Sequence, residues 1–239
     1  MTSDLINTGI YVLDPRVLQK VPPDTPFDFS KNLFPLLLQS GYPMYALEVC
    51  GYWCDIGTVD QYRQANADCL RGRVRVRLQG QEIAPGILSA KSAFVHPTAH
   101  LKAPVLIGEQ VRIEAGAHIG PETVIGNRTV VNPGAIVEQS IIWDECIVGK
   151  QARITGAVIA RGSKVGYGVT VGQGAVLGEQ CEVSRQSTIR RSVKLWPGVK
   201  VGEKAVASRS TVWAQAVPRS TLSRRGLSGL ANAEIGPEL

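Results

Sequence analysis

Three histidines are the first side chains in this sequence that could take part in chemistry. They are His96, His100 and His118, and the last two are 18 residues apart. An acyltransferase needs a base placed beside its acceptor, and a metal site needs three converging ligands. The histidines could serve either purpose, and the more common alternative is a pair of stacked surface residues.

Asp55 and Asn7 are further candidates because each lies in a short polar segment. Asp55 belongs to Trp53-Cys54-Asp55-Ile56-Gly57, and Asn7 begins Asn7-Thr8-Gly9. By residue type alone, Asp55 reads as a carboxylate in a turn or at a helix N-terminus, and Asn7 reads as a turn residue.

The five cysteines do not form a recognisable metal motif. Cys50 and Cys54 are four residues apart, but no second cluster of Cys or His completes a zinc site, and we expect both in the core. An odd number of cysteines in a chain of this size favours reduced thiols. No signal peptide and no apolar stretch of about 20 residues is present. We therefore expect a cytoplasmic protein with no membrane partner.

Composition narrows the class of protein further. Hydrophobic residues make up 44% and aromatic residues only 6%, while glycine occurs 25 times, which favours an aliphatic core with many turns. The net charge of +6 permits anionic partners. Most basic residues are scattered and no nucleic-acid-binding motif accompanies them, so we expect no nucleic-acid partner.

A six-residue repeat dominates residues 91–213. An aliphatic side chain recurs every sixth residue, and the phase slips by one residue after Val137 and again after Ile154. Glycine often follows the aliphatic directly, and a small or β-branched residue comes four positions after it. The aliphatic column comprises Val95, Leu101, Ile107, Ile113, Ile119, Ile125, Val131, Val137, Ile142, Val148, Ile154, Ile159, Val165, Val171, Leu177, Val183, Ile189, Leu195 and Val201.

This spacing fits neither a helix period of 3.6 nor a strand period of 2. It predicts a triangular coil in which three hexads complete a turn of about 18 residues, with the aliphatic inside and glycine relieving the corner. The pattern resembles the left-handed parallel β-helix of hexapeptide-repeat proteins, which implies about six coils. His100 and His118 would then stack on one edge.

The first 70 residues have a different texture and predict an α/β segment. We expect strands over residues 6–13 and 45–49, and helices over residues 16–20, 28–38 and 59–70. Residues 71–90 would connect this segment to the β-helix. The predicted fold class is therefore mainly β, a left-handed parallel β-helix preceded by a partial α/β segment.

Three short segments in this region occur in a recognisable order. They are Asn7-Thr8-Gly9-Ile10-Tyr11, then Phe27-Asp28-Phe29-Ser30-Lys31 with Leu33-Phe34-Pro35, then Gly51-Tyr52-Trp53-Cys54-Asp55-Ile56-Gly57-Thr58. Together with the β-helix that follows, they resemble the sugar-binding half of sugar-1-phosphate nucleotidyltransferases. Mannose-1-phosphate guanylyltransferases are the most similar members.

The resemblance implies roles for individual residues. Asp55 matches one of two aspartates that hold a catalytic Mg²⁺, an ion that prefers carboxylate oxygens. Asn7 matches the asparagine that binds sugar hydroxyls, and Thr8 and Gly9 would shape the same side of the sugar-binding site. Trp53 and Gly57 would support the turn that presents Asp55. We assign no catalytic residue within the chain.

Other parts of the family pattern do not occur in the 239 residues. The sequence contains neither the glycine-rich phosphate loop nor the other metal aspartate. We therefore expect a C-terminal fragment, or the product of a mis-assigned or split gene, that is inactive alone. Residues 214–239 resemble a linker towards a phosphomannomutase-like domain.

The intact parent would bind a sugar-1-phosphate and an NTP, and GDP-mannose synthesis is the expected reaction. Two alternatives stay open at this point. One is a hexapeptide-repeat acyltransferase that uses His96, His100 or His118. The other is a non-enzymatic β-helix assembly or regulatory module. In each case we expect a homo-oligomer formed through the β-helix, because the ends of a β-helix leave strand edges that must be covered.

Overall fold

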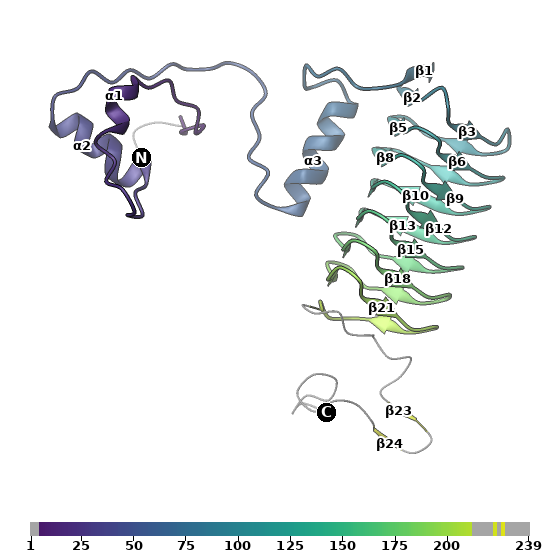
Figure 1. The fold of residues 1–239 in the computed structure, drawn as a ribbon. Coiled ribbons are helices and arrows are strands. Elements are labelled where there is room, and N and C mark those ends of the chain that lie inside the picture. Colours follow the sequence, from purple (N-terminus) through teal and green to yellow (C-terminus); the bar gives the residue numbers. More distant parts are fainter. Residues whose placement is uncertain (1–4, 212–221, 224–225, 228–239) are drawn as a thin grey trace. The chain divides into compact units, whose positions relative to one another are not determined.

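The computed structural model of the chain describes residues 5–211, 222–223 and 226–227 (Figure 1). The chain divides into two compact units, Met1–Trp53 and Cys54–Leu239. Most of the predicted tail, residues 214–239, lies outside the described residues, and its described parts are β23 (Leu222–Ser223) and β24 (Gly226–Leu227).

The first unit is built around short helical segments. These are α1 (Pro15–Leu18), the π-helical turn η1 (Phe29–Leu33) and α2 (Phe34–Gln39). Asp14 caps α1 and Asp28 caps η1, each accepting a hydrogen bond from a backbone N–H of the first turn. The predicted helix over residues 28–38 is thus present, but it begins as a π-helical turn.

The two strands predicted for this unit are not strands in the structure. Residues 6–13 and 45–49 have no regular secondary structure. Their apolar side chains are largely exposed, and Val12 is 100% and Tyr45 is 94% accessible to solvent. A strand requires a partner strand for its backbone hydrogen bonds, so the local preference alone does not produce one.

The second unit begins with α3 (Val59–Leu70), which coincides with the helix predicted from the sequence. Thr58 is its N-cap, because the Thr58 hydroxyl accepts a hydrogen bond from the backbone N–H of Gln61 at 3.1 Å. Arg71, just past the end of α3, forms an ion pair with Glu122 of the β-helix. Arg63 donates a hydrogen bond to the backbone carbonyl of Gln139. These contacts dock α3 on the β-helix (Figure 1).

Three β-sheets form the walls of the β-helix, and parallel pairing joins each strand to its equivalent in the next coil. The first wall contains, in order, β1 (Gln81–Ala84), β2 (Ile87–Ser89), β5 (Val105–Ile107), β8 (Thr123–Ile125), β11 (Ile141–Ile142), β14 (Val158–Ile159), β17 (Val176–Leu177) and β20 (Lys194–Leu195). β1 is the exception, because it pairs antiparallel with β2.

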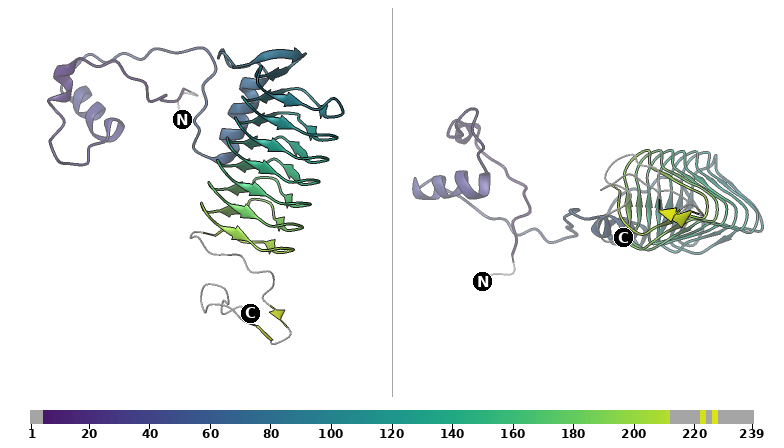
Figure 2. Two further views of the ribbon diagram at one scale, coloured as in Figure 1. Left: turned by 45° about the vertical axis from the view of Figure 1, so that its right-hand side comes forward. Right: turned by 90° about the horizontal axis from the view of Figure 1, so that it is seen from below.

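The other two walls repeat the same pattern. The second wall contains β3 (Phe94–Val95), β6 (Arg112–Ile113), β9 (Val130–Val131), β12 (Ile147–Val148), β15 (Lys164–Val165), β18 (Glu182–Val183) and β21 (Lys200–Val201). The third wall contains β4 (His100–Leu101), β7 (His118–Ile119), β10 (Ile136–Glu138), β13 (Arg153–Thr155), β16 (Thr170–Val171), β19 (Thr188–Ile189) and β22 (Val206–Ala207). Viewed along the axis, successive coils lie over one another (Figure 2).

The repeating aliphatic residues form the interior of the coils, as the sequence predicts. Ile107, Ile125, Ile142 and Ile159 occupy equivalent positions in successive coils of the first wall, and each is at most 1% exposed. The small residues four positions further on are buried beside them, for example Ala117. The phase slips are absorbed by coils of 17 residues, such as the step from Ile125 to Ile142.

Within residues 5–211 the β-helix has seven coils rather than about six, because it begins earlier than the aliphatic pattern shows. The first coil starts at β2, where Ser89 takes the position that Ile107 takes in the next coil. Ser89 is 5% exposed and its hydroxyl donates a hydrogen bond to the carbonyl of Ala90. A buried serine at the interior position hides this coil from a search for aliphatic residues.

The role expected of the corner glycines needs a correction. Most glycines that directly follow the aliphatic residue do not have positive φ; that conformation occurs two residues later, for example at Gln110 and Gly162. The glycines are required by close approach instead. A Cβ at Gly149 would lie 2.5 Å from the backbone of Gly166 in the next coil.

Charged side chains on the outer surface pair between coils. Glu145 accepts hydrogen bonds from Arg161 and Arg128, which lower the pKa of its carboxyl to about 2. Glu182 pairs with Lys200 at 3.2 Å and with Lys164 at 3.7 Å. Much of the basic charge on these coils is therefore neutralised locally.

Candidate functional site

The predicted sugar-binding segment lies in the first unit and forms a local turn. The Asn7 side-chain carbonyl accepts hydrogen bonds from the backbone N–H of Gly9 at 2.9 Å and from the Tyr11 hydroxyl at 3.0 Å. Gly9 has a φ of +75°, a conformation that favours glycine. Asn7 is exposed and Thr8 is half-buried. The conformation of the turn therefore explains why Asn and Gly occupy these two positions. The sugar-binding role stays a prediction.

Aromatic packing fixes this turn to the helical part of the first unit. The Tyr11 ring lies 4.9 Å from the Phe34 ring in an edge-on arrangement and 6.1 Å from the Phe29 ring. Tyr11 also donates the hydrogen bond to Asn7. The side chain of Asn7 is thus held in place through Tyr11 by η1 and α2.

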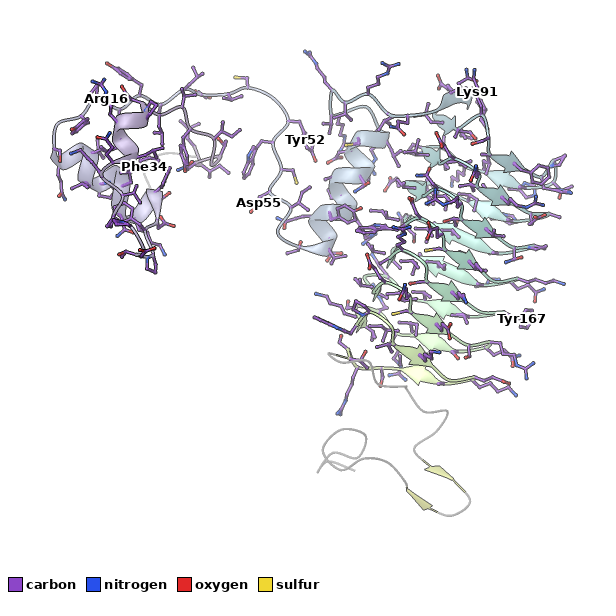
Figure 3. All side chains as sticks on the ribbon, viewed as in Figure 1. Arg16, Phe34, Tyr52, Asp55, Lys91 and Tyr167 are labelled. Carbon is purple, nitrogen blue, oxygen red and sulfur yellow. The ribbon has the colours of Figure 1, made fainter. Side chains whose placement is uncertain are left out.

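Asp55 lies near the start of the second unit, in a segment without regular secondary structure that leads into α3 (Figure 3), so the expected turn is not formed. Asp55 is exposed, and Trp53 at the end of the first unit is 46% exposed. A Cβ added to Gly57 would lie 3.8 Å from an Asp55 carboxylate oxygen and 3.5 Å from Gln61 Oε1, which are ordinary contacts. Gly57 therefore has no steric need to be glycine. Because Asn7 and Asp55 belong to different units, their roles in one site stay a prediction.

Asp55 alone does not make a metal site. Its carboxylate has the right chemistry for Mg²⁺, since hard cations prefer oxygen ligands. Over residues 5–211, however, no group of three or more His, Cys, Asp or Glu side chains is arranged to hold a metal ion. The residues present provide one ligand of the expected set, so no chemical step can be derived through the metal from them.

The histidines on the third wall stack as their spacing predicts. His100 and His118 lie on β4 and β7, and their rings are 4.6 Å apart with an angle of 29° between their planes. His96 is engaged elsewhere, because its Nδ1 accepts a hydrogen bond from the backbone N–H of Thr98. The three histidines do not converge, and this geometry gives no support to an acyltransferase base or a metal site.

The cysteines and the helices add two plain observations. Cys50 is exposed and Cys54 is half-buried, so the expectation that both lie in the core is wrong. Among the residues that the structure describes, no helix combines the length and the apolar character needed to cross a bilayer.

The architecture defines the class of this protein: a parallel β-helix of hexapeptide repeats preceded by a short helical unit. Comparison with known families is consistent with both parts. The family model for the nucleotidyl transferases matches residues 1–72, and the model described as the GMPPB C-terminal domain matches residues 101–212. Over these segments the chain is similar to sugar-1-phosphate nucleotidyltransferases, the family that the sequence motifs indicate.

The individual relatives that match are named as glucose-1-phosphate enzymes. A UTP–glucose-1-phosphate uridylyltransferase from Synechocystis sp. is 36% identical over 122 residues, which cover 50% of this chain and 31% of the relative. A glucose-1-phosphate adenylyltransferase from Clostridium novyi is 41% identical over 68 residues, which cover 26% of this chain and 18% of the relative. The chain thus spans less than two thirds of these relatives.

Solved structures with a similar shape are hexapeptide-type acyltransferases. A perosamine N-acetyltransferase from Caulobacter crescentus is 23% identical, covering 73% of this chain and 68% of its own, with a TM-score of 0.26. A UDP-N-acetylglucosamine acyltransferase from Campylobacter jejuni is 11% identical, with a TM-score of 0.28 and coverage of 49% and 68%. These scores are too low to support an argument about function.

Proposed function

We propose that this chain forms the sugar-phosphate-binding wall and the β-helix of a sugar-1-phosphate nucleotidyltransferase. The observation that supports the proposal is the order of the two matched segments, a nucleotidyl transferase segment followed by a GMPPB-type β-helix. The reaction of this class joins a sugar-1-phosphate to the α-phosphate of an NTP and releases pyrophosphate.

Within that function, Asn7, Thr8 and Gly9 would contact the sugar, and Asp55 would contribute one carboxylate to a Mg²⁺ site. Bound Mg²⁺ supplies neutralisation of phosphate charge during nucleotidyl transfer. The 239 residues contain no glycine-rich phosphate loop and only one of the two expected metal aspartates. We therefore propose that nucleotidyl transfer requires residues beyond these 239.

The proposal also specifies which sugar phosphate and which nucleotide are the substrates. The motifs in residues 7–58 favour mannose-1-phosphate and GTP, and the matched β-helix model is the GMPPB type. The relatives that are named as enzymes act on glucose-1-phosphate. We propose GDP-mannose synthesis and treat glucose-1-phosphate with UTP or ATP as the alternative that the experiment must separate.

The test measures nucleotide-sugar formation by the purified chain with Mg²⁺ and each pair of substrates. We expect no product above the blank, because the phosphate cradle is absent from these residues. In the same samples, mannose-1-phosphate with Mg²⁺ should raise the melting temperature slightly, and more than glucose-1-phosphate does.

Two variants make this test specific. Asp55→Asn should abolish the part of the thermal shift that depends on Mg²⁺, because an amide is a weaker ligand than a carboxylate. Asp60→Asn is the matched control, since Asp60 is an exposed aspartate five residues away. Rapid turnover by the unmodified chain would contradict the need for further residues. An unchanged shift in Asp55→Asn would contradict the metal role of Asp55.

We also propose that the chain forms a homo-oligomer through the β-helix, because among the described residues β3, β4, β21 and β22 are the last strands of their walls. Light scattering coupled to size-exclusion chromatography measures this directly. A single species at the 25.7 kDa mass of one chain, across the micromolar range, would contradict it.

A further inference from the structure

A cavity of about 460 Å³ lies between residues 56–58, the start of α3 and the first wall of the β-helix. It belongs wholly to the second unit. Its walls are mainly apolar, and its lining includes Ile56, Val59, Tyr62, Trp143, Val158 and Lys194. The cavity is a shallow hollow that is largely open to solvent. A second hollow, lined by Arg63 and Glu122 among others, is only about 170 Å³.

Trp143 lines this cavity from the first wall of the β-helix. In successive coils of the first wall, the residue after the interior aliphatic donates its backbone N–H to the next coil, and Trp143 takes this position. The equivalent residues are Gly126, Ala160, Gly178 and Trp196, and of the two tryptophans only Trp143 lines the cavity. Trp143 is 42% exposed, so part of its surface remains accessible. The exposed part of the Trp143 ring is therefore available to a ligand in the cavity.

Lys194 also departs from its column. The outward positions of the first wall are aliphatic through six successive coils, ending with Ile141, Val158 and Val176, and the next is Lys194. Lys194 is exposed and lines the cavity. The aliphatic floor of the cavity therefore ends at a single ammonium group.

The lining favours a flat apolar ring over a polyhydroxylated sugar. A bound sugar needs hydrogen-bond partners for several hydroxyls. The Thr58 hydroxyl is already engaged, because it donates to Gln61 Oε1 at 2.9 Å and accepts from the Gln61 backbone N–H. Trp143 and Tyr62 offer aromatic faces, on which planar bases stack.

The spacing of the two distinctive residues sets the size of the ligand. Trp143 follows β11 and Lys194 lies in β20, three coils further along. At about 4.8 Å per coil, their backbones are about 14 Å apart along the axis, and the lysine side chain shortens this gap. A planar ring joined to an anionic group through a short linker spans such a distance.

We propose that this cavity binds a nucleoside phosphate, with the base stacked on Trp143 and the phosphate paired with Lys194. The cavity is separate from the proposed Mg²⁺ site at Asp55, although Ile56 and Gly57 line it. Occupation of the cavity would therefore restrain Ile56 and Gly57, the residues that follow Asp55.

The experiment titrates the full chain with GMP, AMP and UMP by isothermal calorimetry, alongside guanosine and inorganic phosphate alone. Trp143→Ala should weaken binding at least about fivefold, the lower limit for loss of one stacked base. Lys194→Val should weaken binding of the monophosphate and leave the weaker binding of guanosine unchanged. Both variants keep the fold, because Ala160 and Val176 already occupy the equivalent positions.

Trp196→Ala is the matched control, since Trp196 follows β20 at the same column position and does not line the cavity. It should bind the nucleotides as the unmodified chain does. Three results would overturn the proposal: no nucleotide binding at millimolar concentration, equal losses in Trp143→Ala and Trp196→Ala, or inorganic phosphate binding as tightly as GMP. Because no outcome depends on turnover, failure here is distinguishable from failure of the proposed enzyme activity.

Discussion

Polar residues inside the coils form a hydrogen-bonded column at one corner of the β-helix. The column contains Thr129, Cys146, Ser163 and Cys181, all at most 1% exposed. The Ser163 hydroxyl donates to the carbonyl of Gly178 at 2.8 Å and accepts from the backbone N–H of Cys181 at 3.2 Å. Burial raises the pKa of the Cys146 thiol to about 11, so it stays a neutral donor, here to the carbonyl of Ala160. Each side chain thus satisfies backbone groups of the next coil.

This column predicts the effect of a substitution at Ser163. Ser163→Ala removes the acceptor of the buried Cys181 N–H, and we expect the free energy of unfolding to fall by about 1–3 kcal/mol. Ser163→Cys should cost less, because cysteine occupies the equivalent position in the coils before and after. Urea denaturation followed by circular dichroism measures both. Equal losses in the two variants would show that the hydroxyl's hydrogen bonds are not the cause.

At the scale of elements, the outward face of the first wall explains why α3 docks there. The outward residues of the second and third walls include many charged or polar side chains, whereas those of the first wall are aliphatic up to Val176. Ile141 and Val158 are only 4% and 6% exposed although they point outward. A row of aliphatic side chains on one wall needs a cover, and α3 provides it.

Placing a charge under α3 tests this explanation. In Val158→Lys the coils should stay folded, because Lys194 occupies the same outward position in a later coil. The docking of α3 should weaken by about 1–3 kcal/mol through lost apolar burial and the cost of desolvating the ammonium. Hydrogen exchange would then show faster exchange for the amides of α3 alone. Thr170→Lys, on the exposed face of the third wall, is the control and should leave α3 protected.

At the scale of the whole molecule, the hydrophobic core belongs to the second unit. The main cluster of buried side chains runs from Ile87 to Ala207 and includes no residue of the first unit. The first unit has a small core of its own around Leu33 and Leu37. Coil-to-coil contacts of this kind make the stability of a solenoid a sum of local terms.

Removal of residues 1–53 should therefore leave the β-helix folded. We expect its melting temperature to change by less than about 5 °C, the shift that corresponds to roughly 1–2 kcal/mol in a domain of this size. Thermal denaturation followed by circular dichroism of the shortened and full chains measures the difference. A shortened chain without a cooperative transition would contradict the division into two independent units.

The sequence by itself determined the coils, the start of α3 and the stacking of two histidines. A six-residue period of aliphatic residues has few physical solutions, because each must be buried at the same point of a repeating corner. The N-cap at Thr58 is likewise a local signal. His100 and His118 follow from the coil length alone.

The tertiary structure decided the features that join distant residues. The extended segments at residues 6–13 and 45–49 have strand-like sequences, but pairing depends on a neighbour that local sequence does not supply. The first coil is concealed by Ser89, whose burial is visible only in register with Ile107. The cavity between Trp143 and Lys194 combines residues from α3 and three further coils. The cavity exists because α3 covers the outward face of the first wall. The six-residue repeat describes only the side chains that point into the coils, so it contains no information about the outward face.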